Sequence, residues 1–521
     1  MSAPTPPSGL AKRLVSNTLH AATGRLAAVV VWVLFTPPIL RALGVEGFAV
    51  WALFFALTGY FAALDLGLVQ GTLRHVAAAR ERGAHGEAGA FATLGLVGFL
   101  LLGLVWLVLA LLLRHPLLEW LRIPPAQLAV AGFAMVAGAA VFALAGCANV
   151  TLATLQGYDR FDLANLVSLL VTAQQAVGMV VVLRNDWGLW GLVLNVGVGW
   201  AVGLLSGVLA LRRAVPAFRW TGPRASSAHL RDVLAFGGPM QLASLWAVIH
   251  ANLDKFLLPV FVALSAVTPY ELGSRVVGSI QAFPQMLLLA MLPAASALHA
   301  AGDRARLREL YARGDRYLLT ASALMVAVLV GSADRIFSAW LGPGHAEAVL
   351  VLRGLSLASG VALTTGMASV SARAVGRTDL EAWFGTIVVA LHLALSLLLL
   401  PRLGLAGAVI AFLVANSIAS LSFLLMVGRA LHWRAWDVLV KPHGVPLLAV
   451  AVGVAAGLGL DRALPGATGI TAWTLLALVA GIAGLATLGV LVSTGYFHWR
   501  EARSLLVSLG SPSAEAARRS P

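Results

Sequence analysis

Runs of about 20 mostly apolar residues recur along the 521-residue chain, separated by short polar connections. A helix of that length spans the hydrocarbon core of a bilayer, where backbone polar groups must be satisfied internally. Hydrophobic residues make up 60% of the chain and charged residues 11%, compared with roughly 25% charged residues in a soluble protein. The sequence therefore predicts an all-α polytopic membrane protein without a soluble domain.

Hydropathy predicts fourteen membrane-spanning helices. Their approximate spans are 14–38, 46–70, 89–113, 126–154, 162–183, 188–211, 230–262, 271–298, 316–333, 347–372, 380–400, 404–428, 443–460 and 470–495. Residues 1–13 are expected to form a disordered cytoplasmic N-terminus, and residues 499–521 a cytoplasmic tail. The first helix has no clear small-residue cleavage site after it, so we expect it to be retained and not cleaved as a signal peptide.

The distribution of basic residues predicts the topology. Of the 36 Lys and Arg residues, 25 fall on the side of the N-terminus, 7 fall in the opposite connections and 4 lie within helices. Because cytoplasmic loops of membrane proteins are enriched in Lys and Arg, both termini are expected in the cytoplasm. The net charge of +14 follows from this topology, so no nucleic-acid partner is expected. A single cysteine, Cys147, excludes an intramolecular disulfide and a Cys-pair metal motif, and no cofactor or metal is expected.

The chain also contains an internal repeat. The segment RFDL at 160–163 recurs as RTDL at 377–380, and GLWG at 188–191 recurs as GLAG at 404–407, with an offset of 216–217 residues. Six helices per copy is an even number, so the two copies share one orientation and are related by an axis along the membrane normal. The alternative is convergent Gly-rich loop chemistry. The expected parts are an N-lobe at 14–220, a C-lobe at 221–432 and helices 13 and 14 at 433–498.

Ionisable residues within the predicted helices indicate where function resides. Such groups cost roughly 2.5–3.5 kcal/mol each at the centre of a helix on insertion scales, so they usually face a bundle interior or a water-filled cavity. The candidate substrate-binding cations of a central cavity are Arg25, Lys255, Arg275 and Arg353. The polar residues expected to line this cavity or to couple transport are Asn17, Asp65, Gln241, Ser244, His250, Asn252 and Asp254.

Structural roles are the alternatives for several of these residues. Arg25 has the alternative of snorkelling or of tying two helices together. Asp254 and Lys255 have the alternative of pairing with neighbouring helices. Arg275 has the alternative of pairing locally with Glu271, four residues earlier. For Asp65 a hydrogen-bonded contact at the helix end is the preferred interpretation. If the cavity assignment holds, cations outnumber acidic groups there, and a cationic cavity attracts an anionic substrate such as a phosphate.

Several short segments resemble one known family. They are RALGVEGFAVW at 41–51, LDLGL at 64–68 followed by Arg74, NLDK at 252–255, Leu292-Pro293 and Gly302-Asp303. They resemble bacterial polysaccharide flippases, which share a superfamily with lipid II flippases and multidrug-and-toxin extruders. The resemblance covers about residues 12–498.

The resemblance implies a transporter and not an enzyme. Its expected activity is to flip an undecaprenyl-diphosphate-linked oligosaccharide from the cytoplasmic to the periplasmic leaflet of the bacterial inner membrane, for surface polysaccharide biosynthesis. It implies a V-shaped bundle of two lobes that works by alternating access. The implied partners are the lipid-linked substrate, the bilayer, a coupling proton or sodium ion, and polysaccharide assembly proteins.

Three other functions compete with this one. A drug or cation antiporter of the same superfamily needs an anionic cavity, whereas the predicted cavity is cationic. A membrane-embedded glycan ligase or polymerase needs a large periplasmic loop with catalytic residues, whereas the predicted outer loops are short. A membrane scaffold has no need of ionisable residues at depth in two equivalent helices.

Overall fold

The computed structural model describes the backbone of residues 9–221, 227–434 and 442–498, without the side chains of 9–28, 227–243 and 289–290. All regular elements in these ranges are helices. They are α1 (Gly9–Ala63), α2 (Leu68–Glu81), α3 (His85–Trp120), α4 (Pro125–Gly157), α5 (Phe161–Arg184), α6 (Gly188–Ala214), α7 (Ser227–Phe261), η1 (Leu264–Ala266), α8 (Val267–Ala300), α9 (Arg304–Gly331), α10 (Ala333–Trp340), α11 (Ala346–Leu363), α12 (Gly366–Ala374), α13 (Asp379–Leu403), α14 (Leu405–Ala430), α16 (Gly444–Ala463) and α17 (Ile470–Ser493).

Within the described residues, twelve helical segments are long and apolar enough to cross a bilayer. The chain is therefore an all-helical, multi-pass membrane protein. One of these segments, Val29–Ala63, lies in α1, which contains parts of the first two expected helices joined at Gly44. Gly44 has a φ of 68° and a ψ of 178°, a conformation that only glycine adopts readily. The expected total of fourteen helices remains a prediction.

The prediction of one continuous helix over 46–70 is wrong. The helix stops at Ala63 and resumes at Leu68 as α2. Leu66 and Gly67 between them have φ angles of 56° and 72°, which a right-handed helix cannot accommodate. Asp65 Oδ1 accepts a hydrogen bond from the Gly67 backbone N–H at 2.9 Å and so stabilises the break. The geometry of an Asx turn, in which the side chain replaces a backbone acceptor, accounts for this interruption.

The expected helix at 347–372 is also interrupted, between α11 and α12. The hydroxyl groups of Thr364 and Thr365 donate hydrogen bonds of 2.7 Å to the carbonyl oxygens of Val361 and Ala362. A Thr side chain that bonds the preceding turn competes with the backbone ladder and often bends a helix. Hydropathy alone does not register this competition, because the segment stays apolar throughout.

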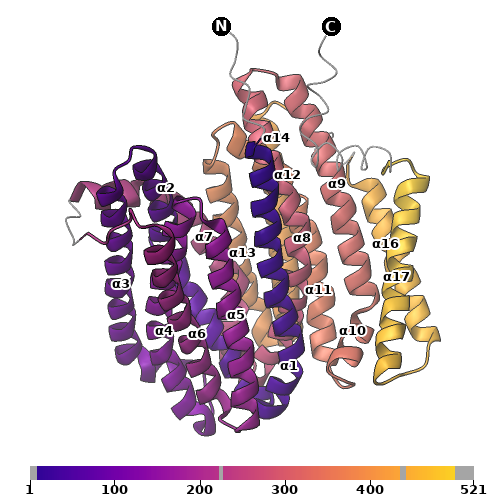
Figure 1. Ribbon diagram of the computed structural model, residues 1–521. Coiled ribbons are helices and arrows are strands. Elements are labelled where there is room, and N and C mark those ends of the chain that lie inside the picture. The colour runs from indigo at the N-terminus through magenta and orange to yellow at the C-terminus, as the bar shows by residue number, and fades with distance from the viewer. Residues whose placement is uncertain (1–8, 222–226, 435–441, 499–521) are drawn as a thin grey trace.

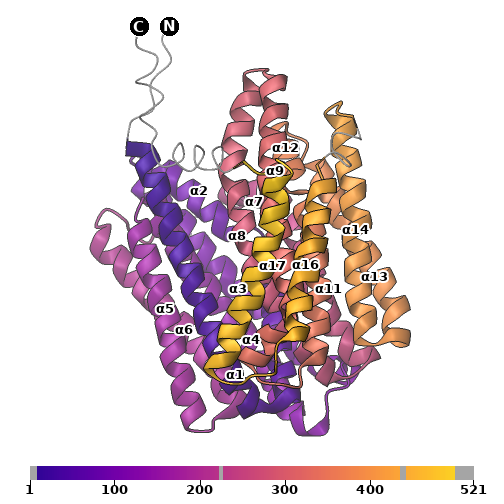
Figure 2. The ribbon, with the colours of Figure 1, turned by 90° about the vertical axis from the view of Figure 1, so that its right-hand side faces the viewer.

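The helices pack in two groups that meet along α1, α2, α7 and α8. In Figure 1, α2–α6 form the left side of the molecule, and α8–α14 form the centre and right. The first helices of the two groups pack together, since α1 contacts α7, η1 and α8, and α2 also contacts α7. The outermost pair, α16 and α17, packs against α9 and faces the viewer in Figure 2.

Arg335 of α10 fixes the connection between α16 and α17. Its guanidinium group is paired with the Asp461 carboxylate and donates hydrogen bonds of 2.8–2.9 Å to the carbonyl oxygens of Asp461, Leu464 and Pro465. Arg335 is buried, so these acceptors replace the water that its charge would otherwise require. The last two helices are therefore fastened to the α9–α10 region at one end.

The repeated sequence segments have matching local structure. Arg160 and Asp162 form a two-bond pair at the start of α5, and Arg377 and Asp379 form the same pair at the start of α13, with all four distances between 2.8 and 3.0 Å. A residue with positive φ precedes each pair, namely Asp159 at 59° and Gly376 at 79°. Likewise, the glycines that precede or begin α6 and α14, Gly188 and Gly404, have φ angles of 54° and 57°.

Close packing of α11 on α14 gives a first testable prediction. A Cβ atom added to Gly354 would lie 2.0 Å from Val409 Cγ1, whereas a Cβ atom added to Gly278 of α8 would meet nothing within 4 Å. We expect Gly354→Ala to lower the free energy of unfolding by about 1–3 kcal/mol through overpacking. Denaturant unfolding in detergent micelles measures this change, with Gly278→Ala as the matched control. Equal stability of the two variants would contradict the packing described here.

Candidate functional site

Asp254 of α7 lies at the centre of a buried hydrogen-bonded group. Its side chain has no exposed surface. Tyr270 of α8 donates a hydrogen bond to Oδ2 at 2.6 Å, and Ser396 of α13 donates one to Oδ1 at 3.1 Å. His392 Nε2, one turn before Ser396, lies 3.0 Å from Oδ2. We call these four residues the Asp254 cluster. Three partners compensate the cost of burying this carboxylate, and they connect α7 with α8 and α13.

His250, one turn before Asp254, extends the cluster toward α14. Its Nε2 lies 3.0 Å from the Asn416 side-chain amide, and its ring stacks on Phe412 with 4.4 Å between centroids. The His250 and His392 rings meet edge to face at 4.8 Å. Two imidazoles and a carboxylate are thus held together in the interior of the second helix group. Such an arrangement can take up or pass on a proton.

A second set of charges lies directly beside the Asp254 cluster, at Lys255 of α7 and the start of α8. Lys255 Nζ is 2.6 Å from Glu271 Oε2, and Arg275 Nε is 2.5 Å from Glu271 Oε1. Lys255 also donates a hydrogen bond of 3.0 Å to Asn252 Oδ1. Glu271 and Arg275 are four residues apart, which places them on one face of α8, as the sequence spacing predicts. We call Lys255, Glu271 and Arg275 the charge triad.

The charge triad lies where the two helix groups meet. The Arg275 guanidinium carbon is 5.5 Å from the centroid of Trp32 and 5.3 Å from that of Phe55, and both rings belong to α1. An arginine over aromatic faces is stabilised by cation–π attraction. Two cations share one carboxylate, so the triad has a net charge of +1. Lys255 and Glu271 are buried, whereas the Arg275 side chain is 34% exposed. A set of charges with a net positive charge and a partly exposed arginine can accept an anion such as a phosphate group.

The two groups are tied together close to the triad. The Thr268 hydroxyl donates a hydrogen bond of 2.6 Å to the Val45 carbonyl, directly after the Gly44 turn. Trp340 Nε1 donates one of 2.7 Å to the Val33 carbonyl. In Figure 1 the α1 turn and α10 both lie toward the lower edge, away from the end where α1 begins. At this end of the molecule, α1 therefore bonds directly to η1–α8 and α10.

The remaining predicted cations are placed differently. Arg353 pairs with Asp334 of α10 at 2.5 Å and donates a longer hydrogen bond to the Val330 carbonyl, so its contacts are separate from the charge triad. The side chains of Arg25, Asn17 and Gln241 lie outside the described residues.

Ser244 and Asp65 are the remaining predicted polar residues. Ser244 is on an exposed face of α7. Asp65 bonds the Gly67 backbone at the break between α1 and α2, which is the kind of contact preferred for it from the sequence. Burial raises the pKa of the Asp65 carboxyl above its usual range, partly offset by the hydrogen bonds from Gly67 and Val69.

Sequence reasoning missed three members of the Asp254 cluster and one of its neighbours. Tyr270, His392, Ser396 and Asn416 are not among the predicted site residues. The available signal was the pair His392 and Ser396, which stand four residues apart in an otherwise apolar helix and therefore share one face. Recognising Tyr270 as a partner required the turn that brings the start of α8 beside α7.

The comparisons with known proteins agree with this architecture. The sequence profile of a family described as "Polysaccharide biosynthesis protein" matches residues 41–350. The lipid II flippase MurJ in an inward closed conformation superposes with a TM-score of 0.68 at 13% identity, over 92% of this chain and 99% of that one. An inward-facing multidrug resistance MATE family transporter of the MOP superfamily gives a TM-score of 0.66 at 18% identity, over 79% of this chain and 94% of that one.

A Vibrio cholerae MATE transporter, VcmN, crystallised as a mutant, gives a TM-score of 0.60 at 19% identity, over 82% of this chain and 98% of that one. At these identities the structural matches establish the fold alone. No curated protein matches the sequence significantly. The profile match covers more than half of the chain, and it confirms the family indicated by the sequence segments at 41–51 and 64–68.

Proposed function

This chain belongs to the polysaccharide biosynthesis protein family, and from that premise we propose that it is a membrane transporter that flips a lipid-linked oligosaccharide. The substrate carries its glycan on undecaprenyl diphosphate and moves from the cytoplasmic to the periplasmic leaflet of a bacterial inner membrane. Both termini lie in the cytoplasm. The N-lobe (14–220) and C-lobe (221–432) alternate in opening, and two further helices (433–498) complete a total of fourteen.

The charge triad is the observation that carries this proposal. It places Lys255 and Arg275 at the junction of the two helix groups with a single carboxylate, Glu271, between them. A diphosphate brings the negative charge that this set lacks, and Arg is well suited to phosphate because its planar donors match two oxygens at once. Arg25 of α1 is the candidate for a further contact from the N-lobe. The lipid chain stays in the bilayer while the glycan occupies the space between the lobes.

The matching turns before α5 and α13, and before α6 and α14, support the two-lobe arrangement. Two lobes of equal orientation that meet mainly through their first helices can rock against each other around a fixed site. The hydrogen bonds from Thr268 to Val45 and from Trp340 to Val33 then belong to a state closed at that end. Opening at that end requires both bonds to break.

The Asp254 cluster is the candidate for energetic coupling. It lies one residue from Lys255 in α7 and contains a carboxylate and His392, whose charges depend on protonation. A proton or sodium ion bound here changes the interactions that hold α7 to α8 and α13. Because α8 also carries Glu271 and Arg275, occupancy of the cluster alters the geometry of the phosphate site.

Reconstitution tests the proposed activity directly. Proteoliposomes that contain the full chain and a fluorescent undecaprenyl-diphosphate oligosaccharide are expected to exchange it between leaflets faster than protein-free vesicles. A membrane-impermeant quencher measures the fraction in the outer leaflet over time. Exchange no faster than in protein-free vesicles, together with pumping of lipophilic cations, would reject the flippase and favour the antiporter.

A further inference from the structure

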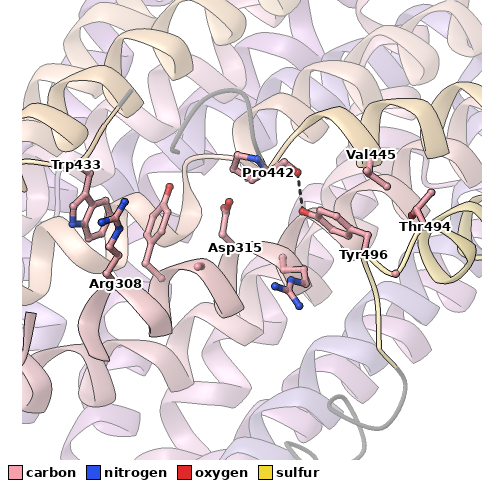
Figure 3. A pocket seen from close by; sticks show the side chains of 11 residues that line it. Arg308, Asp315, Trp433, Pro442, Val445, Thr494 and Tyr496 are labelled. Atoms are coloured by element: carbon pink, nitrogen blue, oxygen red, sulfur yellow. Dashed lines mark hydrogen bonds between the residues drawn. The ribbon is translucent and has the colours of Figure 1, made fainter. Parts of the chain in front are cut away.

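A cavity of about 420 Å³ lies at one end of the bundle, among the ends of four elements. It is lined by the first turns of α9, by Trp433 after α14, by the start of α16 and by the residues that follow α17 (Figure 3). The charge triad lies near the turn between the end of α7 and the start of α8, whereas the cavity lies near the start of α9, which follows the other end of α8. The cavity is therefore distinct from the candidate phosphate site.

Asp315 and Tyr311 line this cavity without using their polar atoms. Asp315 is 1% exposed, and neither of its carboxylate oxygens has a hydrogen-bond partner. The Tyr311 hydroxyl, one helical turn earlier, is also buried and unpartnered. Figure 3 shows the Asp315 side chain pointing from α9 toward Pro442 and Tyr496 across the cavity. An unpaired buried carboxylate is costly, so a ligand that donates hydrogen bonds here gains substantially.

Aromatic rings surround this carboxylate. The ring centroids of Tyr311 and Trp433 are 4.6 Å apart, and Tyr496, whose hydroxyl donates to the Pro442 carbonyl at 2.8 Å, lines the other side. Burial and then the negative charge of Asp315 raise the pKa of Tyr496 well above its usual range. A carboxylate among aromatic faces is a typical arrangement for recognising an organic ammonium group.

Two arginines complete the lining. Arg308 and Arg316 come from the same face of α9, on either side of Tyr311 and Asp315 in sequence. Arg308 and Arg316 each interact with other groups as well, so their contribution to the cavity is the positive charge of their side chains. Basic pockets between the ends of membrane helices attract lipid phosphates, and Trp and Tyr are enriched at the same level. The lining therefore offers positive, negative and positive charge in order along α9.

We propose that this cavity binds the zwitterionic head group of phosphatidylethanolamine. The primary ammonium has three N–H donors, which match the two oxygens of Asp315 and the hydroxyl oxygen of Tyr311. The phosphate lies toward Arg308 and Arg316, and the acyl chains follow α16 and α17 into the bilayer. A single carboxylate offers too few oxygen ligands for Ca²⁺ or Mg²⁺, and it repels a purely anionic head group. The inference does not depend on the identity of the transported substrate.

Lipid titration of the purified full chain in detergent, followed by native mass spectrometry, tests this site. Phosphatidylethanolamine, phosphatidylcholine and phosphatidylglycerol with identical acyl chains are compared. We expect phosphatidylethanolamine to bind about tenfold more tightly than the other two lipids, a ratio that corresponds to one charged hydrogen bond. Asp315→Asn is expected to abolish this preference. Glu309→Gln, which removes an exposed carboxylate from the same helix, is the control that keeps it.

Other outcomes overturn the proposal. Equal binding of the three lipids by the wild type, or an unchanged preference in Asp315→Asn, rejects the ammonium site. If micromolar soluble phosphoethanolamine displaces the lipid fully, the cavity recognises a soluble ammonium phosphate, and the assignment to a lipid is rejected. If Asp315→Asn does not fold, as judged by its thermal transition, Tyr311→Phe removes one acceptor and should lower the preference several-fold, and no change in that variant would also reject the site.

Discussion

Lys255→Met is expected to lower the rate of leaflet exchange by about 100-fold at subsaturating substrate. The substitution keeps the length of the side chain but removes its charge, so the triad changes from a net charge of +1 to neutral. Loss of one buried charged partner of a phosphate weakens binding by about 3 kcal/mol, which corresponds to about 100-fold in the dissociation constant. Initial rates in the quenching assay, measured at several substrate concentrations, give the ratio between variant and wild type.

Glu271→Gln separates a phosphate site from a purely structural ion pair. It leaves both cations in place and raises the net charge of the triad, so we expect unchanged or tighter binding of the diphosphate substrate. If the triad served only to hold α7 to α8, removal of the Glu271 charge would leave Lys255 and Arg275 unpaired. Glu271→Gln would then lose stability and leaflet exchange to the same extent as Lys255→Met. Parallel losses in the two variants would therefore contradict the assignment.

Asp254→Ala is expected to lower the free energy of unfolding by about 3–5 kcal/mol, because it leaves three buried polar groups without their acceptor at about 1–3 kcal/mol each. The groups left without an acceptor are the Tyr270 and Ser396 hydroxyls and one nitrogen of His392. Denaturant unfolding in micelles measures the change. Tyr270→Phe removes one hydrogen bond only and is expected to cost about 1–2 kcal/mol.

Asp254→Asn keeps the shape of the side chain and is the variant for function. If the Asp254 cluster couples transport to a cation, exchange by this variant should lose its response to an imposed proton or sodium gradient while substrate binding persists. Wild-type gradient dependence in a folded Asp254→Asn protein would place the coupling elsewhere. The stability series and the gradient series thus test the structural and the functional role of one carboxylate separately.

Much of the fold could be predicted from the sequence because lipid imposes a simple rule on apolar runs. Span boundaries such as 126–154 agree with α4, Pro125–Gly157, to within a few residues. The interruptions at 64–67 and 364–365 were not predictable from hydropathy, because they depend on left-handed backbone and on hydroxyl groups that bond the preceding turn. Such local competition changes helix geometry without changing how apolar the segment is.

The candidate site was predictable only where its members are close in sequence. Glu271 and Arg275 pair by their spacing within one helix. The contacts of Asp254 with Tyr270 and His392 span 16 and 138 residues, so they depend on the way α7, α8 and α13 come together. The same limit applies to Arg353, whose partner Asp334 lies on α10, a short element after α9 that the predicted spans did not include.

The clamp that Arg335 forms on the connection after α16 has a mechanical consequence. α9 packs along both α16 and α17, and Arg335 bonds the connection between them. The last two helices are therefore attached to the second helix group. If the two helix groups move against each other as proposed, a molecule that binds α17 restrains the second group alone.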